Sequence, residues 1–421
     1  MPGRRRLLIG LGGSAAAAGL GGCSLPARLA ALPEHLRGRE TFHDLPATTR
    51  VVLDGSDSAL LARVALDALQ REIAYAERHG LHGPGVANYL AISGGGENGA
   101  YGAGLLTAWS ELGTRPTFKA VTGVSTGALI APFAFLGPAY DKELEGFYTM
   151  TRASDVMISR GLLTALLSDS LYDSTPLLQT IRKALTPAML DAIAVEYRDK
   201  GRILLVATTD LDVPVGVMWN TAAIAASGSR QRAELIAKIL LASASVPGVY
   251  PPVMIDLEAG GERFQEMHVD GGTVAQVVLY PPSLSGEVLA PLSSSPAVAR
   301  SLAERKRRLY VIRNSRPGGD LQTIDRSTLK IAGRAVSTLI STQGIGDLYQ
   351  LYVLAERDGI DYNVAFIPAS FSEKAREPFD QAYMRKLYAV GRRAMLSGAA
   401  WSKYPPGYDP VPINQRRGGI G

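Results

Sequence analysis

The sequence predicts an α/β protein with a mostly parallel central sheet and helices on both faces of that sheet. From residue 88 onward, short apolar runs alternate with longer segments whose apolar residues recur at helical spacing. Strands that alternate with helices typically form a parallel sheet that is covered on both faces. The chain has 421 residues, 46% hydrophobic and 20% charged, so it can bury one large core.

The expected elements follow one another along the chain, with turn residues between them. An amphipathic helix at 59–79 comes first, and a Pro/Ser-rich stretch at 281–297 is expected to be a long loop. The interrupted apolar segment 156–178 fits a lid or the wall of a binding site as well as it fits plain core. The strands are expected at 88–92, 118–124, 202–211, 308–314 and 363–369. The later helices are expected at 102–112, 127–136, 174–185, 230–242, 328–356 and 380–395.

The first 22 residues have the composition of a secretory signal peptide. Three arginines at 4–6 precede an apolar segment of small residues and glycines that is too short to span a membrane. The single cysteine, Cys23, follows Leu20-Gly21-Gly22. This pattern resembles the bacterial lipobox, in which the cysteine becomes the lipidated first residue of the mature protein. The alternative is an unpaired cysteine within a cleaved leader.

Four parts of the chain are therefore expected. They are a signal peptide (1–22), a lipidated tether with the N-terminal helix (23–85), a main domain (86–400) and a flexible C-terminal tail (401–421). Several acyl chains on one cysteine would hold the protein firmly at a membrane. In lipoproteins of this kind, a serine after the cysteine favours the outer membrane, and Ser24 occupies that position here. The expected location is the bacterial cell envelope, at the outer membrane and facing the periplasm.

The charge of the chain argues against one class of partner. The formal net charge is +5, and the lysines and arginines are mostly scattered. No basic patch with interleaved aromatic residues is present, so we expect no nucleic-acid binding. A mild positive charge suits the anionic head groups of lipids.

A glycine-rich turn follows the strand expected at 88–92. Residues 94–99 read GGGENG and lead into an apolar helix, which would direct backbone N–H groups toward an anion. A dinucleotide site would need an acidic residue at the end of a second strand, and a P-loop would need a lysine; both are missing. An oxyanion hole needs only backbone donors, here those of Gly94, Gly95 and Gly96. Alone, the turn fits a packing role equally well.

A second turn has the pattern GxSxG. Residues Gly123 to Gly127 read GVSTG and lie between an apolar run and a helix. In a nucleophile elbow the serine occupies a strained strand-to-helix turn, and small neighbours avoid clashes there. The glycine-rich turn lies one strand–helix unit upstream. We therefore expect Ser125 to be a catalytic nucleophile rather than a serine in a structural turn.

A nucleophilic serine needs a base. His268 is the sole histidine after Ser125, and Asp270 stands two residues further on, followed by Gly271 and Gly272. Positions 268 and 270 share one face of an extended segment. The spacing therefore leaves His268 or Asp270 as the base, or His268 as an ordinary strand residue.

Together these motifs resemble the patatin-like phospholipases. That family combines three elements in the same order: the oxyanion turn, here 94–99 with Gly99 at its end; the nucleophile elbow; and a D-G-[AG] motif, here 270–272. The segment LLASASVPGVYPPV at 240–253 is similar to the one that precedes the aspartate in the family. The resemblance is strong over residues 88–280 and extends more loosely to about residue 400, so it implies that the domain expected at 86–400 is the catalytic one. Many members carry Arg or Lys after the three glycines, where this chain has Glu97.

The resemblance implies a patatin-like three-layer sandwich and a serine lipid acyl hydrolase of the phospholipase A type. Ser125 and Asp270 would form a dyad that cleaves fatty-acyl esters of phospholipids or related lipids through an acyl-enzyme. No cofactor and no metal ion are implied. The expected partners are the lipid substrate and, through the anchor at Cys23, a membrane. The alternative is a membrane-attached lipoprotein that binds lipid with little or no catalysis.

Overall fold

The computed structural model describes residues 28–42, 45–161, 168–284, 289, 295–318 and 323–410. The expected signal peptide (1–22), Cys23 and residues 411–421 of the expected tail lie outside the described residues.

Every strand and helix that the periodicity predicts is present, with ends shifted by a few residues. The strands among the described residues are β1 (Arg50–Val52), β2 (Ala87–Ile92), β3 (Ala120–Val124), β4 (Ile158–Ser159), β5 (Tyr172–Asp173), β6 (Ile203–Asp210), β7 (Val215–Asn220), β8 (Val253–Ala259), β9 (Glu262–Asp270), β10 (Arg307–Arg313) and β11 (Ile360–Phe366). The α-helices there are α1 (Ser58–Arg78), α2 (Gly99–Glu111), α3 (Thr126–Leu136), α4 (Asp141–Thr149), α6 (Thr175–Ala184), α7 (Pro187–Lys200), α8 (Thr221–Ala226), α9 (Arg232–Ser243), α11 (Pro296–Glu304), α12 (Thr328–Arg357) and α13 (Gln381–Leu396).

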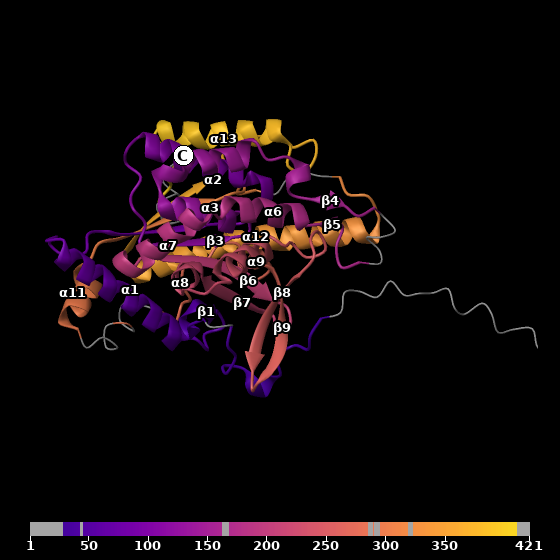
Figure 1. The fold of residues 1–421 in the computed structure, drawn as a ribbon. Helices are drawn as coiled ribbons and strands as arrows, with labels where there is room; N and C mark the ends of the chain where they lie inside the picture. Colours follow the sequence, from indigo (N-terminus) through magenta and orange to yellow (C-terminus); the bar gives the residue numbers. More distant parts are fainter. Residues whose placement is uncertain are drawn as a thin grey trace, which may run out of the picture.

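A mixed sheet forms the centre of the molecule (Figure 1). Its strand order is β1-β7-β6-β3-β2-β10-β11, and β9 joins β6 and carries β8 at its outer edge. The five strands β6, β3, β2, β10 and β11 run parallel, whereas β1, β7, β8 and β9 pair antiparallel with their neighbours. The expectation of a mostly parallel sheet is therefore confirmed.

Helices cover both faces of the sheet, as the apolar strands require. Along β2, Leu90 and Ile92 point into the core that contains α2 and α3. Ala91 points to the opposite face, where Leu348 and Leu351 of α12 pack. In Figure 1, α2 and α13 lie above the sheet and α1 lies below it. This is the three-layer arrangement that the sequence predicts.

Two terminal segments contribute more structure than the sequence suggests. Residues 50–52, within the part expected to be a tether with the N-terminal helix (23–85), form the short strand β1 and pair with β7. Near the other end, Trp401 packs against Trp109 and Tyr310, and Ser402 forms a β-bridge with Val364. The first residues of the expected tail are therefore packed against the domain.

Candidate active site

Ser125 occupies a strained turn between β3 and α3. Its backbone angles are φ 54° and ψ −125°, and within the described part of the chain Phe379 is the other non-glycine residue with a positive φ. A positive φ is unfavourable for residues with a side chain, and it is the geometry expected of a nucleophile elbow. The Ser125 amide donates to Ser243 Oγ of α9 at 3.0 Å, and this hydrogen bond holds the turn against α9.

The glycines on either side of Ser125 have no room for a side chain. A Cβ atom at Gly123 would lie 2.4 Å from the carbonyl oxygen of Gly127. A Cβ atom at Gly127 would lie 2.2 Å from the carbonyl oxygen of Ile92 in β2. The GxSxG spacing is thus required by contacts with the backbone, as the sequence pattern predicts.

The register of β6 brings Asp270 next to Ser125. At the end of β3, Val124 pairs with Ala207, and the following residue of β6, Thr208, pairs with Asp270 at the end of β9. Since β7 occupies the other edge of β6, β3 and β9 share one edge in succession. The residue that follows β3 is Ser125, so the serine and the aspartate meet at this junction.

Asp270 is buried, and its two carboxylate oxygens have different surroundings. Oδ1 accepts a hydrogen bond from the Gly272 amide at 2.7 Å, whereas Oδ2 is buried without a hydrogen-bond partner among the described residues. Burial raises the pKa of Asp270 to about 7, although the nearby Ser125 hydroxyl and the Gly272 amide favour the charged form. A carboxyl group with this pKa can accept a proton near neutral pH.

The glycine-rich turn after β2 lies directly over the serine. A Cβ atom at Gly94 would be 3.1 Å from Ser125 Cβ, and one at Gly95 would be 2.2 Å from the carbonyl oxygen of Asn314. The Gly94 amide already donates to the carbonyl oxygen of Gln276 at 3.1 Å. Of the three predicted oxyanion residues, Gly95 and Gly96 are the ones that line the cavity beside Ser125.

The other motif glycines allow close packing around the site. A Cβ atom at Gly99 would lie 2.4 Å from Thr126 Oγ1, and one at Gly271 would lie 2.5 Å from the carbonyl oxygen of Ala207. At Gly272 it would lie 2.0 Å from Gln276 Nε2. The elbow therefore touches both other motifs, since a Cβ atom at Gly271 would also lie 3.2 Å from Val124 Cγ1.

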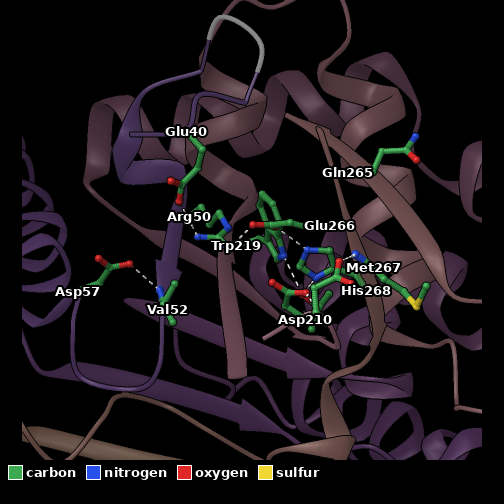
Figure 2. Close-up of polar contacts among 12 residues, drawn as sticks. Glu40, Arg50, Val52, Asp57, Asp210, Trp219, Gln265, Glu266, Met267 and His268 are labelled. Atoms are coloured by element: carbon green, nitrogen blue, oxygen red, sulfur yellow. Dashed lines mark hydrogen bonds and ion pairs between the residues drawn. The ribbon is translucent and has the colours of Figure 1, made fainter. Parts of the chain in front are cut away.

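His268 is a buried strand residue whose ring nitrogens are both engaged away from Ser125. Nδ1 lies 2.9 Å from Thr208 Oγ1, and Nε2 lies 2.9 Å from the Glu266 carboxylate, which also accepts from Arg50 (Figure 2). Of the alternatives left open by the spacing, the geometry therefore favours Asp270 as the base. No group of three or more His, Cys, Asp or Glu side chains in the described ranges could hold a metal ion.

The sequence motifs miss Gln276, which connects the two turns of the site. Its carbonyl accepts from Gly94, its Nε2 donates to the carbonyl of Gly272 at 3.1 Å, and its amide donates to Asp347 Oδ2 at 2.6 Å. Asp347 belongs to α12, and burial raises the pKa of this carboxyl to about 6. Gln276 thus holds the oxyanion turn at a fixed position relative to the turn that carries Asp270.

An apolar cavity of about 530 Å³ opens in front of Ser125. Its walls come from residues 95–98 of the glycine-rich turn, from α3, from the segment 156–177 and from residues 375–379. The segment that fitted either a lid or plain core therefore contributes to the cavity wall, through Val156, Met157, Tyr172 and Leu177. Residues 162–167 of that segment lie outside the described residues.

Glu97 holds one wall of this cavity in place. Its carboxylate accepts a hydrogen bond from the Phe379 amide, and burial raises the pKa of the Glu97 carboxyl. Phe379 has a φ of 57°, and its neighbours Arg376 and Glu377 also line the cavity. The residue that stands where relatives often carry a cation therefore binds the protein's own backbone.

The strained serine, the glycine-rich turn and the buried aspartate together have the geometry of a nucleophile-elbow site, and comparison with known proteins agrees with this class of site. Residues 90–281 match the family model described as patatin-like phospholipase. This part of the chain belongs to that family, as the motifs indicate, and the membership supports lipid hydrolase activity.

Two solved structures illustrate how distant the similar folds are. The structure of VipD from Legionella pneumophila is 10% identical, with a TM-score of 0.36, over 75% of this chain and 68% of VipD. Human GIVD cytosolic phospholipase A2 is 11% identical, with a TM-score of 0.26, over 83% of this chain and 56% of the human one. No curated protein matches the chain by sequence.

Replacing Gln276 by Ala is expected to reduce kcat for lipid-ester hydrolysis roughly 10- to 100-fold with little change in KM, because small displacements of reacting groups are costly. The free energy of unfolding should fall by only about 1 kcal/mol, the value of one hydrogen bond. Steady-state kinetics and thermal unfolding would measure both. Gln350→Ala, at an exposed position of α12, is the matched control and should change neither quantity. A loss of activity that merely follows a loss of folded protein would contradict the positioning role.

Proposed function

We propose that the protein is a serine lipid acyl hydrolase of the phospholipase A type, which cleaves fatty-acyl esters with a Ser125–Asp270 dyad. The main support is the junction on β6, where a strained serine meets a buried carboxyl group whose pKa is raised to about 7. An apolar cavity opens at the same point. The family membership supports lipid as the substrate class.

The first half of the proposed reaction transfers the acyl group to the enzyme. Ser125 Oγ attacks the ester carbonyl carbon while its proton passes to the Asp270 carboxylate. The carbonyl oxygen becomes an oxyanion, which the amides of Gly95 and Gly96 stabilise by about 3 to 4 kcal/mol per donor. The bond to the alcohol then breaks, the alcohol takes the proton from Asp270, and the acyl group stays on Ser125.

The second half releases the fatty acid. A water molecule attacks the acyl carbon and gives a proton to Asp270. The bond between the acyl carbon and Ser125 Oγ breaks, and Oγ recovers its proton from Asp270. Ser125 Oγ attacks in the first half and leaves in the second. In each half Asp270 takes a proton from the attacking oxygen and gives it to the leaving oxygen, so one base serves both halves.

The cavity supports a long apolar substrate. Its volume lies within the range of about 300 to 1,000 Å³ that is usual for ligand sites. Its lining includes Leu129, Phe147, Met157, Tyr172 and Tyr250, which suit an acyl chain. Because Glu97 is bound to Phe379, selection by this wall would depend on shape more than on a charge at position 97.

We further propose that Cys23 is lipidated after removal of residues 1–22 and anchors the protein at the outer membrane, facing the periplasm. The support is the sequence alone, namely the basic leader and the Leu20-Gly21-Gly22-Cys23 pattern. Lipid substrates would then lie beside the enzyme.

Ser125→Ala and Asp270→Asn should each reduce hydrolysis at least about 1,000-fold, because the nucleophile and its base act as a unit. Incubation with a panel of defined lipids, with identification of the released products, would measure this and name the acyl position. A fluorophosphonate probe should label the native serine and fail on Ser125→Ala.

His268→Gln keeps a donor for Glu266 and should retain most activity. If that variant folds but loses activity, a histidine triad replaces the dyad; if the native chain neither labels nor turns over, the protein is a lipid-binding lipoprotein.

The pH profile should follow the titration of Asp270. The carboxylate is the active form and the pKa is about 7, so kcat/KM for an uncharged ester should rise with pH and be half-maximal near pH 7. At pH 5 the rate should be about a hundredfold below its plateau, since each pH unit below the pKa costs a factor of ten. A profile that is already flat above pH 5 would show that Asp270 has an ordinary pKa and would contradict this role for burial.

Cys23→Ala should move the protein from the membrane fraction to the soluble fraction after a high-salt wash, because the acyl chains that hold it would be missing. Fractionation and immunoblotting would measure the change. Ser24→Ala, which keeps the cysteine, serves as the control and should remain in the membrane fraction. If Cys23→Ala stays there as well, the lipid anchor is wrong.

A further inference from the structure

The long helix α12 is covered by the rest of the domain along only part of its length. In its carboxyl-terminal half, Leu348, Leu351 and Ala355 are buried against the sheet. In its amino-terminal half, the residues from 330 to 342 are all exposed or half-buried. Leu339 is 69% exposed there, and Ile331 and Val336 are exposed as well. Apolar side chains gathered on an uncovered helix indicate a contact surface.

The uncovered half of α12 extends beyond the edge of the sheet that carries the active site. Arg313, the last residue of β10, donates to the carbonyl oxygen of Ser341, and Gly344 lies against the Gln276 side chain. The other end of α12 reaches Ile360, where β11 begins. The helix therefore runs antiparallel to the strands. Residues 328–340 continue past the carboxyl edge by about 20 Å, at about 1.5 Å per residue. In Figure 1 this part of α12 is drawn on the same side of the molecule as β4 and β5.

Exposed apolar side chains also flank the cavity. They are Met150, which is 70% exposed, Ile158 and Leu171. Each is next in sequence to a residue that lines the cavity, respectively Thr151, Met157 and Tyr172. Met150 and Leu339 are the two most exposed large hydrophobic side chains in the described part of the chain. Met150 adjoins the cavity lining, and Leu339 lies on the part of α12 that extends past the edge of the sheet that carries the active site.

The charge around the uncovered half of α12 narrows the choice of partner. Residues 326–346 contain Arg326, Lys330 and Arg334 and no acidic residue. Lys330 pairs with Asp325, just before this stretch, and the net charge of residues 325–346 is still positive. An amphipathic helix with basic residues and exposed apolar ones suits the surface of a membrane that contains anionic lipids.

We propose that the amino-terminal half of α12, together with Met150, Ile158 and Leu171, docks on an anionic lipid surface and places the cavity opening against it. This inference rests on the proposed hydrolase function, since it supplies the path by which a lipid ester reaches Ser125. A membrane is favoured over a second copy of the chain because the basic residues of this helix half suit anionic lipid, and because Met150, Ile158 and Leu171 adjoin residues that line the cavity. No helix in the described ranges is long and apolar enough to cross a membrane, so α12 would lie at the interface.

The test uses the full chain with Cys23→Ala, so that no acyl anchor contributes. Sedimentation with vesicles of phosphatidylcholine and phosphatidylglycerol would measure binding, and turnover of the same vesicles would measure interfacial activity. Ile331→Asp with Leu339→Asp should weaken binding at least about tenfold and reduce vesicle turnover in parallel, because two apolar contacts are replaced by charges that anionic lipid repels. Hydrolysis of a soluble short-chain ester should not change, because neither residue contacts the cavity.

Val353→Asp is the matched control. Val353 is 62% exposed on the covered half of the same helix and should tolerate the charge without loss of vesicle binding. Equal weakening by Val353→Asp, or unchanged binding by the double variant, would overturn the proposal. So would a native dimer that the double variant splits while vesicle binding persists, because the surface would then join two copies. If the soluble ester is not hydrolysed although vesicles are bound, the proposed reaction fails and the docking surface stands.

Discussion

The site depends on one shared edge of β6. On that edge β3 is paired as far as Ala207, and β9 takes over at Thr208. Neighbouring strands lie about 4.8 Å apart, so the ends of two strands that follow one another along one edge must be close. Gly271 lets the chain leave this junction, because a Cβ atom there would be 2.5 Å from the Ala207 carbonyl oxygen. Moving either strand by one residue would separate the nucleophile from the carboxyl group or bring the two backbones into collision.

The same junction determines the protonation chemistry. Because Asp270 lies where three strands meet, water is excluded and the neutral carboxyl group is favoured. The Gly272 amide holds one oxygen and leaves the other without a partner. Burial, rather than a neighbouring histidine, thus brings the pKa to the pH at which proton transfer from a hydroxyl is useful. His268 meanwhile serves the fold, through its contacts with Thr208 and Glu266.

The sequence predicts the parallel part of the sheet because buried strands appear as continuous apolar runs, as in β2 and β6. The antiparallel strands β8 and β9 escape notice because their buried residues alternate with less buried ones and no helix separates them. Strand β7 escapes notice because it follows β6 directly, without the helix that separates parallel strands. Ser125 follows from a local pattern, whereas the preference for Asp270 over His268 came from the family resemblance. Contacts such as that of Glu97 with Phe379, 282 residues apart, leave no trace in a local pattern. Gln276 was missed for the same reason, since its partners Gly94 and Asp347 come from opposite parts of the chain.

The backbone contacts of the motif glycines also determine where this protein can vary. Gly95, Gly123, Gly127 and Gly271 each face a carbonyl oxygen at a distance that admits no additional atom. Substitutions at these four glycines are therefore excluded by steric clashes with the backbone, whatever a new side chain could add. The cavity wall is built instead from exchangeable side chains such as Phe147, Met157 and Tyr250. New substrate preferences can consequently arise through the wall alone, while the chemistry stays fixed.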